Sequence, residues 1–200
     1  YLDTTGQSIN AVVKIDFRAI DVSTNLRVEL HQNLDVRDVK TADGKSLTFQ
    51  RENDNPLFVN VNLPEPVAVG KTVTLTFSYA GLLVNEENSP VPNIRVASIG
   101  KEWVYLLLPS RWFPLTNYPA NRYTGTFRLN VPDTMAMAGT GKADSPQPIA
   151  PRAPAEGKRL IYTFRCDRPE PNGSFVAGPL QLSGSWPCPG RGKAGRPGWR

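Results

Sequence analysis

Apolar and polar residues alternate along much of the chain, and this period of two is typical of strands that bury one face. Between Ile9 and Ala19 every second residue is apolar, while Lys14, Asp16 and Arg18 lie in the other phase. Alternating or continuous apolar runs predict further strands at 26–30, 47–49, 57–63, 73–79, 103–108, 127–131, 160–164 and 175–182. No window has the i, i+3, i+4, i+7 spacing of an amphipathic helix, so the sequence predicts an all-β fold.

Short turns separate most of these predicted strands. Asp43-Gly44 and Gly70-Lys71 are turn signals, and Pro64 ends a strand because proline cannot donate to a ladder. Sequential strands joined by short turns favour antiparallel sheets, so we expect an antiparallel β-sandwich of about nine or ten strands. Segments that are more polar, irregular or rich in proline are predicted to be loops, at 84–100, 109–122 and 143–157.

The composition changes near residue 183, which divides the chain into a predicted β-sandwich domain at 1–182 and a tail at 183–200. The tail contains five Gly and three Pro but no Leu, Ile or Val. It cannot bury enough apolar surface to offset its ordering entropy, so we expect it to be disordered. GC-rich DNA read out of frame gives a similar composition, and we hypothesise that the tail is a frameshift product or the edge of a truncated gene.

Most of the net charge of +5 comes from this tail. The tail has no acidic residue and four basic ones, Arg191, Lys193, Arg196 and Arg200, and without them 19 basic residues balance 18 acidic ones. We therefore expect the domain to lack the basic field that nucleic acid requires. No segment approaches the roughly 20 apolar residues of a membrane-spanning helix.

The chain has one histidine and two cysteines, which restricts its chemistry. A catalytic zinc site often uses two or three His, and a Ser-His-Asp triad would have to use His31. His31 lies in the polar phase of its predicted strand, so we interpret it as a surface histidine. A disulfide between Cys166 and Cys188 is left open. We expect no metal site and no catalytic residue on this chain, with carboxylate catalysis as a weaker alternative.

Aromatic residues are concentrated in one segment of 21 residues, which contains Trp103, Tyr105, Trp112, Phe113, Tyr118 and Tyr123. The segment could form a stacking platform for a sugar or for a peptide side chain. Alternatively, Trp103 and Phe113 belong to the core and the other rings pin a loop to a sheet edge. The candidate contact residues for an interface or a ligand are Trp103, Tyr105, Trp112, Tyr118 and Arg122.

Several short motifs give a more specific indication. Residues 110–120 read Ser-Arg-Trp-Phe-Pro-Leu-Thr-Asn-Tyr-Pro-Ala, and residues 127–132 read Phe-Arg-Leu-Asn-Val-Pro. Phe-Ser-Tyr-Ala-Gly stands at 77–81 and Phe-Val-Ala-Gly at 175–178. In this order and spacing, the motifs resemble the N-terminal domain of the zinc aminopeptidases of the aminopeptidase N family, over roughly 9–182. The family's Asp-Glu before proline is replaced here by Asn117-Tyr118.

The resemblance implies an open, saddle-like β-sandwich that caps a catalytic domain and holds part of the substrate N-terminus. It also implies that the chemistry lies outside this chain, since the family's Gly-x-Met-Glu-Asn and His-Glu-x-x-His motifs are not in it. Zinc is then expected only in a catalytic domain, which would be the partner. Many relatives with this sandwich are exported or tethered to membranes, so the resemblance weakly favours an extracytoplasmic or membrane-associated location.

Two functional hypotheses follow. The first is a non-catalytic domain of an aminopeptidase N-like protein, which meets its partner at the edge around Trp112 and Tyr118. The second is a stand-alone module that binds glycan or peptide through the aromatic segment 103–123.

Overall fold

The computed structural model describes residues 1–84, 94–151 and 157–180. Over these residues the chain forms fifteen β-strands and one short 3₁₀ helix, η1 (Pro109–Arg111). Every pairing between strands is antiparallel. The predicted all-β, antiparallel class is therefore confirmed.

The N-terminal half contributes two sheets. The first has the order β1-β2-β7-β4, made of β1 (Leu2–Asp3), β2 (Ser8–Arg18), β7 (Thr72–Leu82) and β4 (Leu34–Thr41). The second has the order β3-β6-β5, made of β3 (Ser23–Glu29), β6 (Phe58–Val67) and β5 (Phe49–Arg51). β2 and β7 pair over all eleven residues of each strand, which makes this ladder the longest in the N-terminal half.

The C-terminal half also contributes two sheets. One has β14 (Arg159–Glu170) between β10 (Tyr123–Pro132) and two short strands, β12 (Lys142–Ala143) and β13 (Gln147–Ile149). The other has the order β11-β15-β9-β8, made of β11 (Ala136–Gly139), β15 (Phe175–Gly178), β9 (Val104–Leu106) and β8 (Ala97–Ile99).

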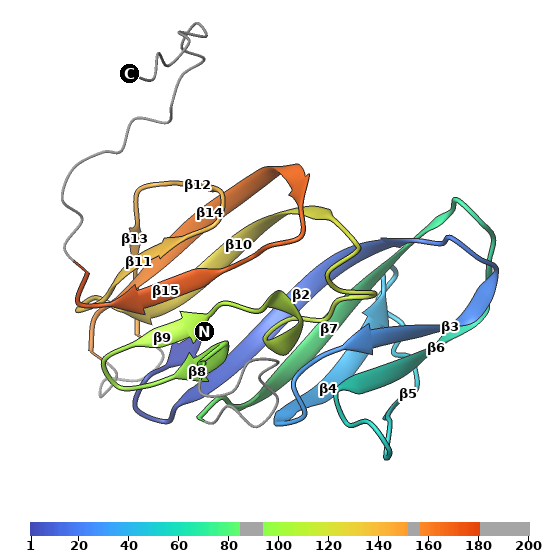
Figure 1. Cartoon of the computed structure of the whole chain (residues 1–200), viewed down its shortest axis with the longest axis horizontal. Coiled ribbons are helices and arrows are strands. Elements are labelled where there is room, and N and C mark those ends of the chain that lie inside the picture. Colours follow the sequence, from blue (N-terminus) through green and yellow to red (C-terminus); the bar gives the residue numbers. More distant parts are fainter. Residues whose placement is uncertain (85–93, 152–156, 181–200) are drawn as a thin grey trace, which may run out of the picture.

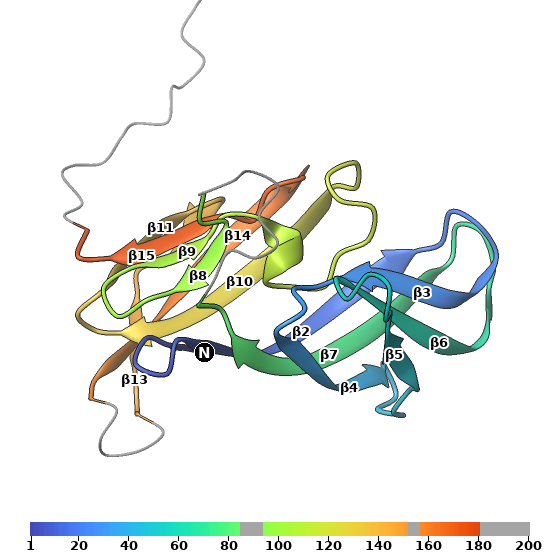
Figure 2. The same ribbon diagram turned by 60° about the horizontal axis from the view of Figure 1, so that its bottom comes forward.

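These sheets form two layers around one core. The long strands β2, β7, β10 and β14 lie in one layer, and the smaller β3-β6-β5 and β11-β15-β9-β8 sheets cover it (Figures 1 and 2). One cluster of buried side chains extends from Leu2 through Phe77 and Val104 to Ala177. The architecture is thus the predicted open sandwich, whose inward faces are the apolar phases of the strands.

Two predicted loops contain strands. β8 lies within 84–100, and its three residues are all buried, so no polar phase marks them. β13 lies within 143–157, and its three residues are all exposed at a sheet margin. β4 was not predicted, because a bulge between Val36 and Asp38 shifts its apolar residues out of phase. These strands account for part of the excess over the nine or ten expected.

The predicted tail at 183–200 lies outside the described residues, and so does the proposed domain boundary at residue 182. The thiol of Cys166 is buried, and burial raises its pKa. Its pairing with Cys188 also lies outside the described residues. In the part of the chain that the structure describes, no helix is both long and apolar enough to cross a membrane.

Candidate functional site

The aromatic segment begins at Trp103, directly before β9, and continues through η1 and a loop to the start of β10 (Figure 1). Pro109 starts η1, where its fixed φ suits a helical turn, and the N–H of Trp112 donates to the carbonyl of Pro109 at 3.0 Å. This single turn changes the direction of the chain. The rings before it therefore lie on the sheet β11-β15-β9-β8, whereas Trp112 and Phe113, directly after it, enter the core.

Trp112 and Phe113 lie in a buried aromatic cluster. Trp112 is 3% exposed, and its ring centroid lies 4.6 Å from Phe113, 5.6 Å from Phe127 and 5.6 Å from Phe175. These spacings and the large interplanar angles are those of favourable edge-to-face packing. The Trp112 indole therefore packs inside this chain, which agrees with a core role rather than with a direct contact to a partner.

The backbone of Trp112 is also held. The hydroxyl of Tyr79, a fully buried residue of β7, donates to the Trp112 carbonyl at 2.7 Å. Burial raises the pKa of this tyrosine above its ordinary value, so the hydroxyl remains a donor across the physiological range. The bond ties the aromatic cluster to the long β2–β7 ladder.

Trp103 and Tyr105 lie on the outer face of β9. Val104 and Leu106, in the other phase of the strand, are completely buried, whereas Trp103 and Tyr105 are half-buried. Their rings are stacked, with centroids 6.3 Å apart and an interplanar angle of 13°. Trp103 also packs closely on Gly178 of β15, where a Cβ would lie 2.4 Å from the indole. This pair is a partly exposed aromatic surface on a central strand.

Tyr118 and Arg122 lie in the loop between η1 and β10. Asn117 adopts a left-handed φ of 48°, which Asn tolerates better than most residues, and its carbonyl accepts from the N–H groups of Ala120 and Asn121. Burial and the nearby Glu29 raise the pKa of Tyr118, while Arg111 opposes the shift. Arg122 is exposed. The loop thus places Tyr118 near a charged pair that sequence reasoning did not identify.

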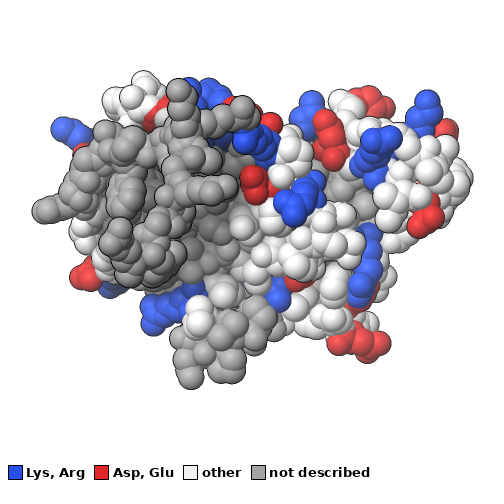
Figure 3. Space-filling model, turned by 45° about the horizontal axis from the view of Figure 1, so that its top comes forward, with Lys and Arg blue, Asp and Glu red and all other residues white. Residues whose placement is uncertain are grey.

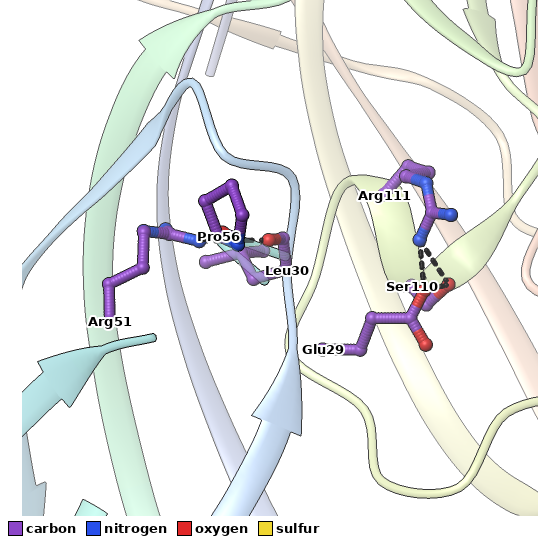
Figure 4. A network of polar contacts seen from close by, with 6 residues as sticks. All are labelled: Glu29, Leu30, Arg51, Pro56, Ser110 and Arg111. Carbon is purple, nitrogen blue, oxygen red and sulfur yellow. Dashed lines mark hydrogen bonds and ion pairs between the residues drawn. The ribbon is translucent and has the colours of Figure 1, made fainter. Parts of the chain in front are cut away.

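That pair is Glu29 with Arg111, and Ser110 completes it (Figure 4). Arg111 is 8% exposed and forms an ion pair with Glu29, whose carboxylate also accepts from the Ser110 hydroxyl at 3.0 Å. The N–H of Glu29 donates to the Leu115 carbonyl at 2.7 Å. The aromatic segment is thereby fixed to the end of β3. No sequence signal identified this pair, because both residues lie in regions with ordinary polar spacing.

The segment after β3 also corrects the interpretation of His31. His31 is 3% exposed and its Nδ1 accepts from the N–H of Asn33 at 3.1 Å, so it is a buried histidine and not a surface one. β3 ends at Glu29, so the strand phase does not continue to His31. Arg51 stabilises this turn by donating to the carbonyl of Leu30 (Figure 4). It also donates to the carbonyl of Leu34, and burial lowers the pKa of its guanidinium.

Charge and metal-binding groups are dispersed over the described residues. Lys and Arg side chains lie among Asp and Glu on the face seen in Figure 3, without a field of one sign over the described residues there. Within 1–84, 94–151 and 157–180, no three His, Cys, Asp or Glu side chains are placed to hold a metal ion. The structure therefore brings the candidate residues together as two aromatic groups and one ion pair.

Known proteins match this chain in structure but not in sequence. No protein-family model matches the sequence. No curated protein sequence matches it either. A crystal structure of the M1 zinc metallopeptidase from Deinococcus radiodurans superimposes with a TM-score of 0.70 and 20% identity, over 88% of this chain and 39% of that chain.

Structures of variants of M1 zinc metallopeptidases give a similar match. A single-residue variant of the Deinococcus radiodurans enzyme bound to a Tyr-Ser-Ala substrate has a TM-score of 0.71 and 19% identity, over 89% of this chain and 40% of that chain. A two-domain M1 zinc metallopeptidase variant bound to L-tryptophan has a TM-score of 0.71 and 20% identity, over 88% of this chain and 39% of that chain. The chain thus spans about two-fifths of the length of these enzymes, and its fold is an all-β domain that resembles their N-terminal region.

Proposed function

We propose that this chain is a non-catalytic domain of an M1-type zinc metallopeptidase and that it packs on a catalytic domain and caps the active-site cleft. The observation that supports the proposal is the extent of the match: nearly nine-tenths of this chain corresponds to about two-fifths of each enzyme. In this proposal, zinc and peptide hydrolysis belong to the partner domain. The sandwich contributes a wall of the cleft and restricts the length of substrate that enters.

The contact surface in this proposal combines two groups of the aromatic segment. Trp103 and Tyr105 offer a stacked, half-buried apolar face at β9, and Tyr118 and Arg122 lie in the loop before β10. Aromatic residues and Arg are enriched at protein interfaces. Trp112 supports this surface from inside, because its ring belongs to the buried cluster.

Measurements of zinc content and aminopeptidase activity test whether zinc binding and hydrolysis belong to the partner domain. Purified 1–200 would be measured for bound zinc and for hydrolysis of a panel of amino-acid anilides, alone and mixed with the catalytic domain of an M1 enzyme from the same organism. We expect no stoichiometric zinc and no turnover by 1–200 alone. Stoichiometric zinc together with turnover by 1–200 would overturn the proposal.

Binding to that catalytic domain tests the contact surface. The double variant Trp103→Ala/Tyr105→Ala is expected to weaken binding at least about tenfold, since truncation of aromatic anchors commonly costs 2 kcal/mol or more, roughly. Val69→Ala is the matched control, because Val69 is an apolar residue that is 60% exposed at another part of the surface. Equal affinity of the wild type and the double variant would exclude this face as the contact.

The stacked Trp103–Tyr105 pair also suits a second function, a stand-alone module that binds glycan or peptide by stacking. Titration of 1–200 alone with oligosaccharides and short peptides, followed by tryptophan fluorescence, separates the two. Saturable binding that Trp103→Ala removes, with no affinity for a catalytic domain, would favour the module.

A further inference from the structure

Two strands of the long layer have one edge without a neighbouring strand among the described residues. β2 pairs with β7 along its whole length, but on its other side only β1 pairs with it, at Ser8 and Ile9. β10 pairs with β14 on one side only. The two open edges face each other, and the strands run in opposite directions (Figures 1 and 2).

A groove of about 1190 Å³ separates these edges. Residues 9–16 of β2 and 123–129 of β10 line its two sides, and Tyr1 and Leu2 lie at one end. The volume exceeds that of most small-molecule pockets, and the space runs between two strands, with Tyr79, Trp112 and Phe113 among the other residues that line it. The groove therefore has the form of a channel for extended polypeptide.

Incomplete burial along β2 shows that the core is not fully covered here. Ile9, which lies opposite Leu2 of β1, is 3% exposed. Farther along the same face, Ala11, Val13 and Ile15 pack against the core but are only partly buried. The apolar phase of β2 thus loses its cover where β1 ends.

The backbone of β2 gives the register. Tyr1 and Asn10 exchange both hydrogen bonds, with the N–H of Asn10 donating to Tyr1 at 3.0 Å and the terminal ammonium donating to Asn10 at 2.9 Å. In an antiparallel pair such groups recur at every second residue. The N–H and C=O groups of Val12, Lys14 and Asp16 therefore point into the groove, and those of the odd-numbered residues bond to β7.

We propose that this groove seats one more extended strand, which continues β1 beyond Tyr1 and joins the two sheets of the long layer into one. The occupant is polypeptide attached to the amino group of Tyr1, antiparallel to β2 and parallel to β10. Its first residue before Tyr1 lies opposite Ala11, and its eighth lies opposite Arg18. It pairs with the backbone N–H and C=O groups on the open edge of β2, which could otherwise pair with other chains.

The groove also specifies the side chains of this strand. Directly opposed residues of an antiparallel pair project to the same face. Residues opposite Ala11, Val13 and Ile15 therefore face the core and are apolar. Residues opposite Lys14 and Asp16 face solvent and are polar. The strand alternates in the phase that Leu2 and Tyr1 already establish.

Extensions placed before Tyr1 test the proposal on the full chain. One variant carries eight residues of alternating Thr and Val, with Val directly before Tyr1. A matched control has the same eight residues with one glycine inserted before Tyr1, which moves every side chain to the opposite face. Amide hydrogen exchange of Val12, Lys14 and Asp16 and the melting temperature are measured for both, with sedimentation to give the oligomeric state.

The in-register extension is expected to slow exchange of these amides at least about tenfold and to raise the melting temperature by about 3 °C or more. The shifted control should give clearly less protection. Equal protection by the two extensions, or none by either, would overturn the proposal. It would also be overturned if 1–200 without an extension were a dimer in which these amides are already protected, because the occupant would then be a second copy.

Discussion

The two groups of aromatic residues in the segment 103–123 have opposite positions in the fold. Trp103 and Tyr105 stack on the outer side of the sheet at β9 and are half-buried. Trp112, only nine residues later, is 3% exposed and contacts three other rings. Aromatic density alone therefore does not locate a binding surface. What separates the two groups is the strand phase of β9 and the change of direction at η1.

The largest expected difference between the two groups is in the free energy of unfolding when one aromatic side chain in each is truncated. Trp112→Ala removes a large buried side chain from a packed cluster and is expected to lower the free energy of unfolding by about 3–5 kcal/mol. Trp103→Ala, on the outer face, should cost about 1 kcal/mol. Urea unfolding of the two variants measures the difference. Similar losses would show that the outer pair is also part of the core.

Removal of one member of the Glu29–Arg111 pair should weaken the attachment of the buried aromatic cluster to β3 without changing an aromatic side chain. Arg111→Met leaves the Glu29 carboxylate without its largely buried partner, at a cost of about 3 kcal/mol. The double variant Glu29→Gln/Arg111→Met should recover part of that loss, since the uncompensated charge is gone. A double variant less stable than Arg111→Met, in the same urea experiment, would contradict this explanation.

Two glycines allow each aromatic group to be strained in turn. A Cβ at Gly139 would lie 2.1 Å from the buried Phe175 ring, and one at Gly178 would lie 2.4 Å from Trp103. Overpacking costs about 1–3 kcal/mol, and we expect Gly139→Ala to fall at the upper end because Phe175 has no space to move. Gly178→Ala should cost less and should change Trp103 fluorescence. The reverse order of stabilities would indicate that Trp103 is the more constrained ring.

The smallest effect is expected at a site remote from both groups. Arg27 forms a 2.6 Å ion pair with the solvent-accessible Glu52, and hydrogen bonds from Arg27 and then Asn60 lower the pKa of Glu52 to about 2. The ionised carboxylate therefore stabilises the fold at pH values above its ordinary pKa of 4.5. This contribution is lost as the pH falls toward about 2.

Glu52→Gln should remove this pH dependence and leave Trp103 and Trp112 fluorescence unchanged. Thermal unfolding between pH 6 and pH 2, roughly, compares the variant with the wild type. If both proteins lost stability in parallel over this range, the Glu52 carboxylate would not be the group that titrates.

The long strands could be predicted from sequence because each buries one face. Residues 9–19 show a regular period of two, and they form β2 almost without a boundary error. The short strands could not, since β8 is buried on both faces and the bulge in β4 breaks its phase. The resemblance stated for 9–182 is confirmed at the level of fold, because a structure of about 20% identity superimposes on 88% of this chain.

The candidate site was predicted less completely. The sequence located the aromatic segment, but the alternatives of platform and core remained open until β9 and η1 were placed. The structure assigns Trp112 to the core and leaves Trp103 and Tyr105 accessible. The Glu29–Arg111 pair could not have been found, because it joins residues that are 82 positions apart.

Arg159 joins two parts of this domain that are made at different times. Its guanidinium donates to the Leu2 carbonyl at 2.7 Å and lies over the Tyr1 ring at 4.1 Å, although 157 residues separate Arg159 from Leu2. Loop closure of this length is slow to form, and Tyr1 and Leu2, which are made before Arg159, must wait for β14. Tyr1 and Leu2 are therefore made well before β14 and are among the last described residues to be fixed in place.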